Sequence, residues 1–359
     1  MAKSCYIHIP FCDSICSYCD FTRVVMNDSI FQAWKEQLLN EMDAYSIQNL
    51  KTLYFGGGTP SLLEPKDFME ICQHLPKNIE EFTVECNPES VSISKLKAYT
   101  KCGVNRISLG VQSFNDELLK ICSRKHTASQ AIQAVQTIKN QGISNISIDL
   151  IFGLPHQTLE DVKKDLNSFI ELDLPHLSIY SLQIEENSIF GKQKIQPCDA
   201  DLEADMFEYI EEFMKEHGYV HYEISSFCKL GYASKHNLAY WQDQDFYGIG
   251  CGASGRLDGI RYDNTKNLKQ YCQSGAHVQW IEESLQERSM DAIMMALRTS
   301  AGLNIHQWNA KYSMDFESKY FTVLEQYKDY FKRKGNILSL NEEGFEILNT
   351  ILVDFMMIE

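Results

Sequence analysis

The chain has 359 residues with 33 basic and 49 acidic side chains, which gives a formal net charge of −16 at pH 7. This acidic balance argues against a protein that wraps nucleic acid, because such proteins depend on many contacts to phosphates. The length predicts two domains and a large core. Twelve cysteines, no secretory signal and no long apolar run predict a cytoplasmic location and no membrane-spanning segment.

Strands and helices are expected to alternate through the first half of the chain. Strand-like runs lie at residues 5–9, 52–56, 82–86, 105–111, 146–152 and 177–182. Amphipathic helical stretches lie between or after them, at residues 28–45, 65–74, 90–99, 128–141, 159–172 and 200–216. Six β/α units predict an α/β fold with a parallel sheet and are too few for a closed eight-stranded barrel. We therefore expect an open, partial (β/α)6 barrel.

The pattern changes after residue 220. Residues 221–227 predict one more strand, and residues 235–257 are expected to be rich in loops. From about residue 264 the chain is mostly helical, with one β-like run at 337–340 that suggests the wing of a winged-helix-like domain. The expected division is a barrel domain over residues 1–220, a connecting segment over 221–263 and a helical domain over 264–359.

Three cysteines with C-x3-C-x2-C spacing, Cys12, Cys16 and Cys19, follow the first predicted strand. Ligands of α/β proteins bind beyond the carboxyl ends of strands, which is where Pro10 places this loop. Iron–sulfur clusters ligated entirely by protein use four cysteines, so three would leave one iron of a four-iron cluster open. A zinc site and scattered core cysteines are the alternatives, but zinc usually requires a fourth nearby ligand.

A glycine-rich loop, Gly56 to Ser61, follows the second predicted strand. Its glycines allow close approach of the backbone to a ligand, and a plain tight turn is the alternative. Polar side chains also recur at the later strands: two follow the third, one follows the fourth, one lies a helix further on and one lies within the fifth. In this architecture such side chains usually line the site, and a helix cap or a surface salt bridge is the alternative for each. They are Glu85, Asn87, Gln112, Arg124 and Asp149.

Five segments together carry a family resemblance: YIHIPFCDSICSYCDF, YFGGGTPS, TVECNPES, SLGVQSF and IDLIFGLPHQT. They resemble the radical S-adenosylmethionine (SAM) superfamily and, within it, the coproporphyrinogen III oxidase-like branch. The resemblance implies a 4Fe–4S cluster on the three cysteines and SAM chelating the open iron, with a reduced cluster able to release a deoxyadenosyl radical. It further implies a set of SAM contacts, with Tyr18 against the adenine: Tyr6, Tyr18, Gly58, Thr59, Glu85, Gln112, Arg124 and Asp149.

The resemblance leaves three activities to separate. One is haem transport by a chaperone that delivers haem to haem-dependent respiratory proteins, with room for peripheral contact at a membrane. Another is the oxygen-independent dehydrogenation of coproporphyrinogen III to protoporphyrinogen IX; a radical enzyme for another substrate is a third reading. The chaperone is favoured because Asp20 and Phe21 follow Cys19 without the oxidase's further cysteine, and because Cys12 lies too near the start for the oxidase's N-terminal arm.

The third feature that favours the chaperone is HNLAYW, residues 236–241, which matches the HNxxYW pattern of the haem chaperone branch. His236 offers an imidazole for iron, Asn237 could orient it, and Tyr240 and Trp241 offer flat apolar area for a macrocycle. A turn followed by two core aromatics is the alternative. Cys251 or Cys228 is a rival thiolate ligand, because both lie near this motif in the sequence. Relatives often carry a histidine after GAGA, where this chain reads GCGASGRL, and its absence would weaken the site or shift the role to Cys251.

Overall fold

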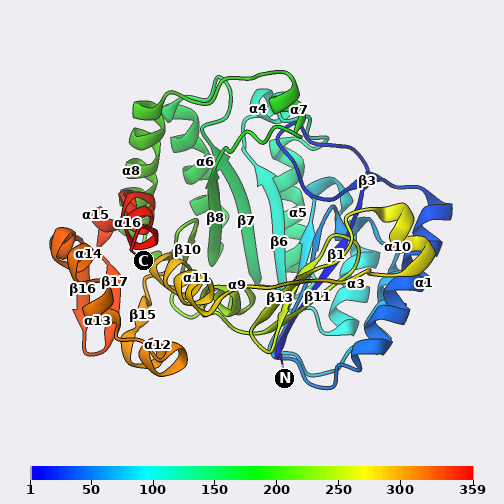
Figure 1. Cartoon of the computed structure of the whole chain (residues 1–359). Helices are drawn as coiled ribbons and strands as arrows, with labels where there is room; N and C mark the ends of the chain where they lie inside the picture. The colour runs from blue at the N-terminus through cyan, green and yellow to red at the C-terminus, as the bar shows by residue number, and fades with distance from the viewer. Residues whose placement is uncertain (1, 359) are drawn as a thin grey trace.

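The computed structural model describes residues 2–358, and its main element is an open sheet of twelve strands (Figure 1). Six neighbouring strands in the middle of the sheet are parallel and follow the chain order. They are β1 (Ser4–Ile9), β4 (Thr52–Gly57), β5 (Glu81–Cys86), β6 (Arg106–Gln112), β7 (Asn145–Phe152) and β8 (His176–Ser181). The predicted partial barrel of six β/α units is therefore confirmed.

The strands and helices form for the reasons that the sequence suggests. The central strands are buried along nearly their whole length, as expected for a parallel sheet that is covered on both faces. Helix α1 buries the predicted stripe of Phe31, Trp34, Leu38 and Met42, and Thr127 and Thr158 begin two helices with capping boxes. The helices of the six units are α1 (Asp28–Tyr45), α2 (Pro65–Gln73), α3 (Ile93–Cys102), α5 (Ala128–Asn140), α6 (Leu159–Glu171) and α8 (Ala200–Glu216).

Both edges of the barrel sheet are extended by later parts of the chain. The single strand expected at 221–227 is a hairpin of β9 (Val220–Glu223) and β10 (Ser226–Cys228), which adds antiparallel to β8. The segment expected to be rich in loops instead forms α9 (Lys235–Trp241) and part of the sheet. Strand β11 (Phe246–Ile249) pairs in parallel with β1, and β12 (Ser254–Leu257), β13 (Ile260–Asp263) and β14 (Gln279–Ile281) follow antiparallel.

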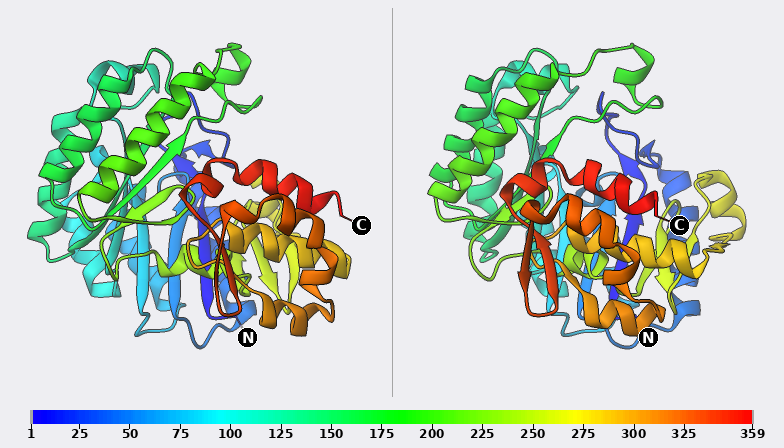
Figure 2. Two further views of the ribbon diagram at one scale, coloured as in Figure 1. Left: turned by 90° about the vertical axis from the view of Figure 1, so that its left-hand side faces the viewer. Right: turned by 60° about the vertical axis from the view of Figure 1, so that its left-hand side comes forward.

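Helix α10, in yellow, packs against α1, whereas the later elements lie beside the sheet, in orange and red in Figures 1 and 2. Helices α11 to α16 surround a three-stranded sheet in the order β15-β17-β16, in which β17 is the β-like run expected near the end. Their bounds are α10 (Leu268–Ser274), α11 (Leu285–Leu297), β15 (Leu303–Asn304), α12 (Ile305–Tyr312), α13 (Phe316–Lys319), α14 (Phe321–Gln326), β16 (Phe331–Lys334), β17 (Ile337–Leu340), α15 (Glu342–Glu346) and α16 (Leu348–Met356).

The apolar core consists of two main parts, one under the barrel sheet and one among the C-terminal helices. One large cluster of buried side chains runs from Cys5 to Tyr271 under the barrel helices, and a second runs from Ala292 to Phe355. The cavity described below lies between elements of these two parts. Among residues 2–358, none of the helices combines the length and the apolar character needed to cross a bilayer.

Candidate cluster site and adjoining cavity

The cysteine loop is fixed at its base by backbone pairing. Cys12 belongs to β2 (Phe11–Cys12), which pairs in parallel with β3 (Val24–Val25). The residues between these two strands form a loop that contains Cys16 and Cys19. The Val24 amide donates to the Pro10 carbonyl over 2.7 Å, and the Met26 amide donates to the Cys12 carbonyl over 2.9 Å. The loop is thus held at the carboxyl end of β1, as the sequence predicts.

The glycine-rich loop lies directly against this base. The Gly58 amide donates to the Ile9 carbonyl over 2.8 Å, and the Thr59 amide donates to the Phe11 carbonyl over 2.8 Å. A Cβ at Gly58 would lie 2.7 Å from the Phe11 oxygen and 3.0 Å from the Cys12 sulfur, so this position requires glycine. The second strand's loop therefore packs onto the first strand's cysteine loop.

A chain of polar side chains connects two of the cysteines. The Thr59 hydroxyl donates to the Cys12 sulfur over 3.5 Å, and Asn87 donates to that hydroxyl over 3.4 Å. Arg124 Nη2 donates to Asn87 Oδ1 over 2.9 Å, and Arg124 Nη1 donates to the Cys16 sulfur over 3.4 Å. Three segments, which follow β4, β5 and β6, thus converge on the cysteine loop, and Asn87 links the other two.

The chemistry of the donors fits a thiolate-ligated cluster. Burial raises the pKa of the Cys12 thiol, and burial raises that of the Cys19 thiol to about 11. The Arg124 guanidinium opposes this effect at Cys12, and its buried Nε has no hydrogen-bond partner among the described residues. A positive charge beside the sulfurs favours thiolates, the form that binds metal. No set of three or more His, Cys, Asp or Glu side chains in residues 2–358 is arranged to hold a single metal ion.

Two buried carboxyl groups lie in the sheet beyond the cluster loop. Glu85 accepts from Tyr54 OH over 2.8 Å and from the Gly57 amide over 3.0 Å, and burial raises its pKa to about 7. Asp149 accepts from Ser108 over 2.8 Å, and burial raises its pKa to about 6. The Glu85 carboxyl is therefore about half-protonated near pH 7, whereas the Asp149 carboxyl is mostly ionised there. Carboxyl groups with raised pKa values of this kind cluster at functional sites.

Of the remaining predicted SAM residues, Tyr6 lies within β1, Gln112 ends β6 and Tyr18 lies in the cysteine loop. Gln112 ends β6 after a register shift and has a positive φ of 71°, a strained conformation of the kind found at functional sites. Tyr6 OH donates to His8 Nδ1 over 2.9 Å. Tyr18 packs against a small apolar cluster that includes Leu118 and Phe190. The neighbouring Ser17 fixes this part of the loop, because its amide donates to the Cys122 carbonyl over 3.0 Å.

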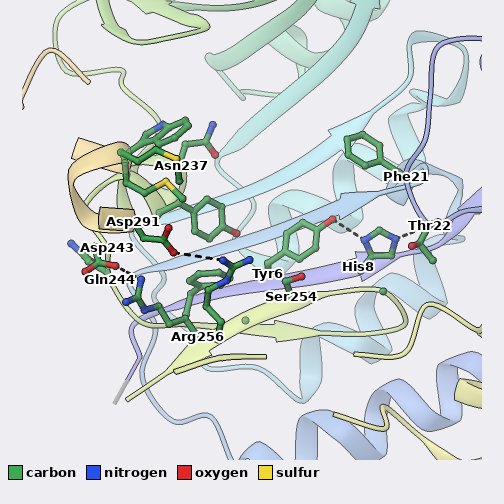
Figure 3. Close-up of a pocket in the computed structure, with 18 of the residues that line it drawn as sticks. Tyr6, His8, Phe21, Thr22, Asn237, Asp243, Gln244, Ser254, Arg256 and Asp291 are labelled. Carbon is green, nitrogen blue, oxygen red and sulfur yellow. Dashed lines mark hydrogen bonds and ion pairs between the residues drawn. The ribbon is translucent and has the colours of Figure 1, made fainter. Parts of the chain in front are cut away.

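A cavity of about 850 Å³ opens beside the amino-terminal strand (Figure 3). One wall carries Tyr6, His8 and Thr22, which lie on β1 and in the cysteine loop. Another carries Asn237, Tyr240 and Trp241 of α9, and further walls come from the β11–β13 strands and from α11. Three of the four predicted haem-binding residues therefore line one cavity of the size that binds a large organic ligand.

His236 lies behind this wall and does not line the cavity. It is 1% exposed, its Nδ1 is 2.9 Å from the Thr52 hydroxyl and its Nε2 is 2.6 Å from Tyr240 OH. Burial lowers its pKa to about 3, so the ring is neutral. Both ring nitrogens are engaged, and in this arrangement the residue positions Tyr240 at the cavity wall.

The two rival cysteines are also buried away from the cavity. Cys251 is 0% exposed and donates to the Thr265 carbonyl, while Cys228 lies within β10. Burial raises their thiol pKa values to about 12 and about 11, respectively. The cavity residues that sequence reasoning missed, such as His8, Arg256 and Met295, carry no motif, since only the packing of distant segments brings them together.

Comparison with known proteins places this geometry in a family. Residues 6–169 match the Radical SAM superfamily. The chain is 39% identical to the haem chaperone HemW of Lactococcus lactis, over 99% of this chain and 97% of that protein, and 35% identical to HemW of Bacillus subtilis, over 99% of both. The chain therefore belongs to the HemW family of radical SAM proteins. It also superimposes on the solved structure of coproporphyrinogen III oxidase HemN from Escherichia coli with a TM-score of 0.85, at 20% identity, covering 99% of this chain and 90% of that one, which confirms the fold.

Proposed function

We propose that this chain is a cytoplasmic haem chaperone that binds haem as cargo and delivers it to haem-dependent respiratory proteins. The observation that carries the proposal is the cavity of about 850 Å³ that Asn237, Tyr240 and Trp241 of the HNxxYW segment line together with side chains of β1, the strand that leads into the cysteine loop. Family membership supports it, because the relatives from Lactococcus lactis and Bacillus subtilis are named haem chaperones.

The proposal includes a 4Fe–4S cluster on Cys12, Cys16 and Cys19, with SAM at its open iron. When bound, a reduced cluster of this kind supplies an electron to the sulfonium of SAM. The protein's own part is to fix the loop through β2 and β3 and to hold positive charge at Arg124 beside the sulfurs. The residues proposed to contact SAM are Tyr6, Tyr18, Gly58, Thr59, Glu85, Gln112, Arg124 and Asp149.

The aromatic wall of the cavity suits a flat macrocycle. Tyr240 stands edge-on to Phe246, with 4.5 Å between ring centroids, and both side chains line the cavity. Aromatic faces of this kind contribute large apolar contact at little cost in conformational freedom. His236 holds Tyr240 through its hydroxyl, so the HNxxYW segment acts as one unit in which the histidine supports the contact residues.

One anaerobic experiment separates the candidate activities. The protein with its reconstituted cluster is titrated with haem, and a parallel sample receives reductant, SAM and coproporphyrinogen III. The proposal expects saturable haem uptake by absorbance and no protoporphyrinogen. Formation of protoporphyrinogen at a useful rate would establish the dehydrogenase instead. SAM cleavage without haem uptake or porphyrin turnover would indicate a radical enzyme for another substrate.

A further inference from the structure

The cavity contains several side chains that could bind haem iron, and most of them are already engaged. His8 is buried, its Nδ1 accepts from Tyr6 OH, and its Nε2 lies 2.8 Å from the Thr22 carbonyl (Figure 3). Tyr240 OH is bonded to His236. Each of these phenols and imidazoles would have to break a buried hydrogen bond before it could bind iron, which costs free energy.

The acidic side chains of the cavity are also poor candidates. Asp243 pairs with Arg256, and Asp291 lies 3.6 Å from Arg261. Carboxylates are hard ligands that suit Mg²⁺, Ca²⁺ and Mn²⁺, whereas haem iron in proteins is bound by His, Cys, Met or Tyr. Lys266 is exposed, and its ammonium has no lone pair to give.

Two thioethers on α11 remain. Met294 and Met295 both line the cavity and are half-buried, and α11 packs against α9, so these side chains share the cavity with the HNxxYW wall. They differ in one respect. Met294 packs against the apolar cluster from Ala292 to Phe355, whereas none of the apolar clusters found in residues 2–358 includes Met295. The Met295 side chain therefore lines the cavity and does not pack into an apolar core.

A group of cations marks one side of the same cavity. Arg256, Arg261 and Lys266 contribute to its lining. Arg256 is 8% exposed, and its Nε has no hydrogen-bond partner among the described residues, although Nη1 bonds to Asp243. A buried guanidinium with unused donor capacity is a natural partner for a carboxylate. A ligand with carboxylates on its rim and a metal at its centre would use both the cations and the methionine thioethers of this cavity.

We infer that haem binds in this cavity with its iron ligated by the thioether of Met295 and its propionates directed to Arg256, Arg261 and Lys266. This inference rests on the proposed function and names the contacts of the same site. A thioether is neutral, so it needs no deprotonation, and it is a soft ligand.

The test uses the full-length protein with its cluster, as wild type and as Met295→Leu and Met294→Leu. Leucine conserves the side-chain volume, so both variants should fold. In the ferric haem complex, a thioether ligand gives a weak far-red sulfur-to-iron charge-transfer band. We expect this band in the wild type and in Met294→Leu and its loss in Met295→Leu, with affinity for ferrous haem about tenfold weaker in Met295→Leu.

Iron-free protoporphyrin IX serves as the second probe, because it offers no axial bond. It should bind all three proteins equally, which also reports that the cavity is intact. An unchanged band and affinity in Met295→Leu, or their loss in Met294→Leu alone, would overturn the assignment. If the wild type takes up haem without showing the band, Met295 is not an iron ligand, but the chaperone proposal is unaffected. Failure of the wild type to bind either porphyrin would refute both.

Discussion

Asp243 connects the strand side of the cavity to helix α12. Its carboxylate accepts hydrogen bonds from Arg256 and Lys311, and from Tyr312 OH over 3.1 Å. The Asp243 and Arg256 side chains are only 8% and 9% exposed, whereas Lys311 is 51% exposed. One carboxylate therefore makes one buried and one exposed ion pair, which allows the two to be compared.

Asp243→Asn removes the charge and keeps the shape of the side chain. The backbone at this position has a φ of 55°, a conformation that asparagine tolerates, so the substitution adds little strain. Removing one partner of a buried ion pair costs about 3–5 kcal/mol. The amide oxygen of asparagine still accepts a hydrogen bond, so we expect the lower end, a loss of about 3 kcal/mol. Lys311→Ala breaks only the exposed pair and should cost at most about 1 kcal/mol.

The measurement is urea unfolding at neutral pH, followed by circular dichroism, for the wild type and both variants. The midpoint of Asp243→Asn should fall well below that of Lys311→Ala, with similar slopes. Equal losses in the two variants would show that burial does not set the strength of these pairs, and the reasoning would be refuted.

Three further predictions concern the two sites. Cys16→Ala should prevent assembly of the brown cluster, whereas Cys86→Ala, a buried control, should retain full iron; full iron in Cys16→Ala would disprove the ligand assignment. Because burial raises the thiol pKa values of Cys12 and Cys19, ligation must release protons, so cluster affinity should fall as pH falls; reconstitution yield between pH 6 and pH 8 that does not vary would contradict this. His236→Ala should weaken haem binding and leave the iron of the cluster intact; an unchanged titration would exclude His236.

The sheet itself could be read from the sequence, because its signals are local. Each of the six parallel strands is an apolar run, and each predicted run agrees with the observed strand to within one residue at either end. The stripe of Phe31, Trp34, Leu38 and Met42 has helical spacing within 12 residues and is buried as expected. Short-range periodicity of this kind depends only on neighbouring residues, so a single sequence contains it.

Residues 220–263 could not be predicted in the same way. Strand β11 is short, and its partner is β1, with Cys5 opposite Tyr247 across most of the chain. The sequence predicts a single strand at 221–227 because no Gly, Pro or Asn marks the turn between β9 and β10. Pairing between segments so far apart has no local signature, and β propensity depends strongly on the partner strand.

The sequence by itself determined the alternating fold, the cysteine loop at the end of the first strand and the glycine loop beside it, because spacing and side-chain type specify these features. Only the tertiary structure decided that His236 is enclosed while Tyr240 and Trp241 face a cavity, and that Met295 meets them there. The physical reason is that burial and hydrogen bonding depend on which distant segments pack together: α11 against α9, and β11 against β1.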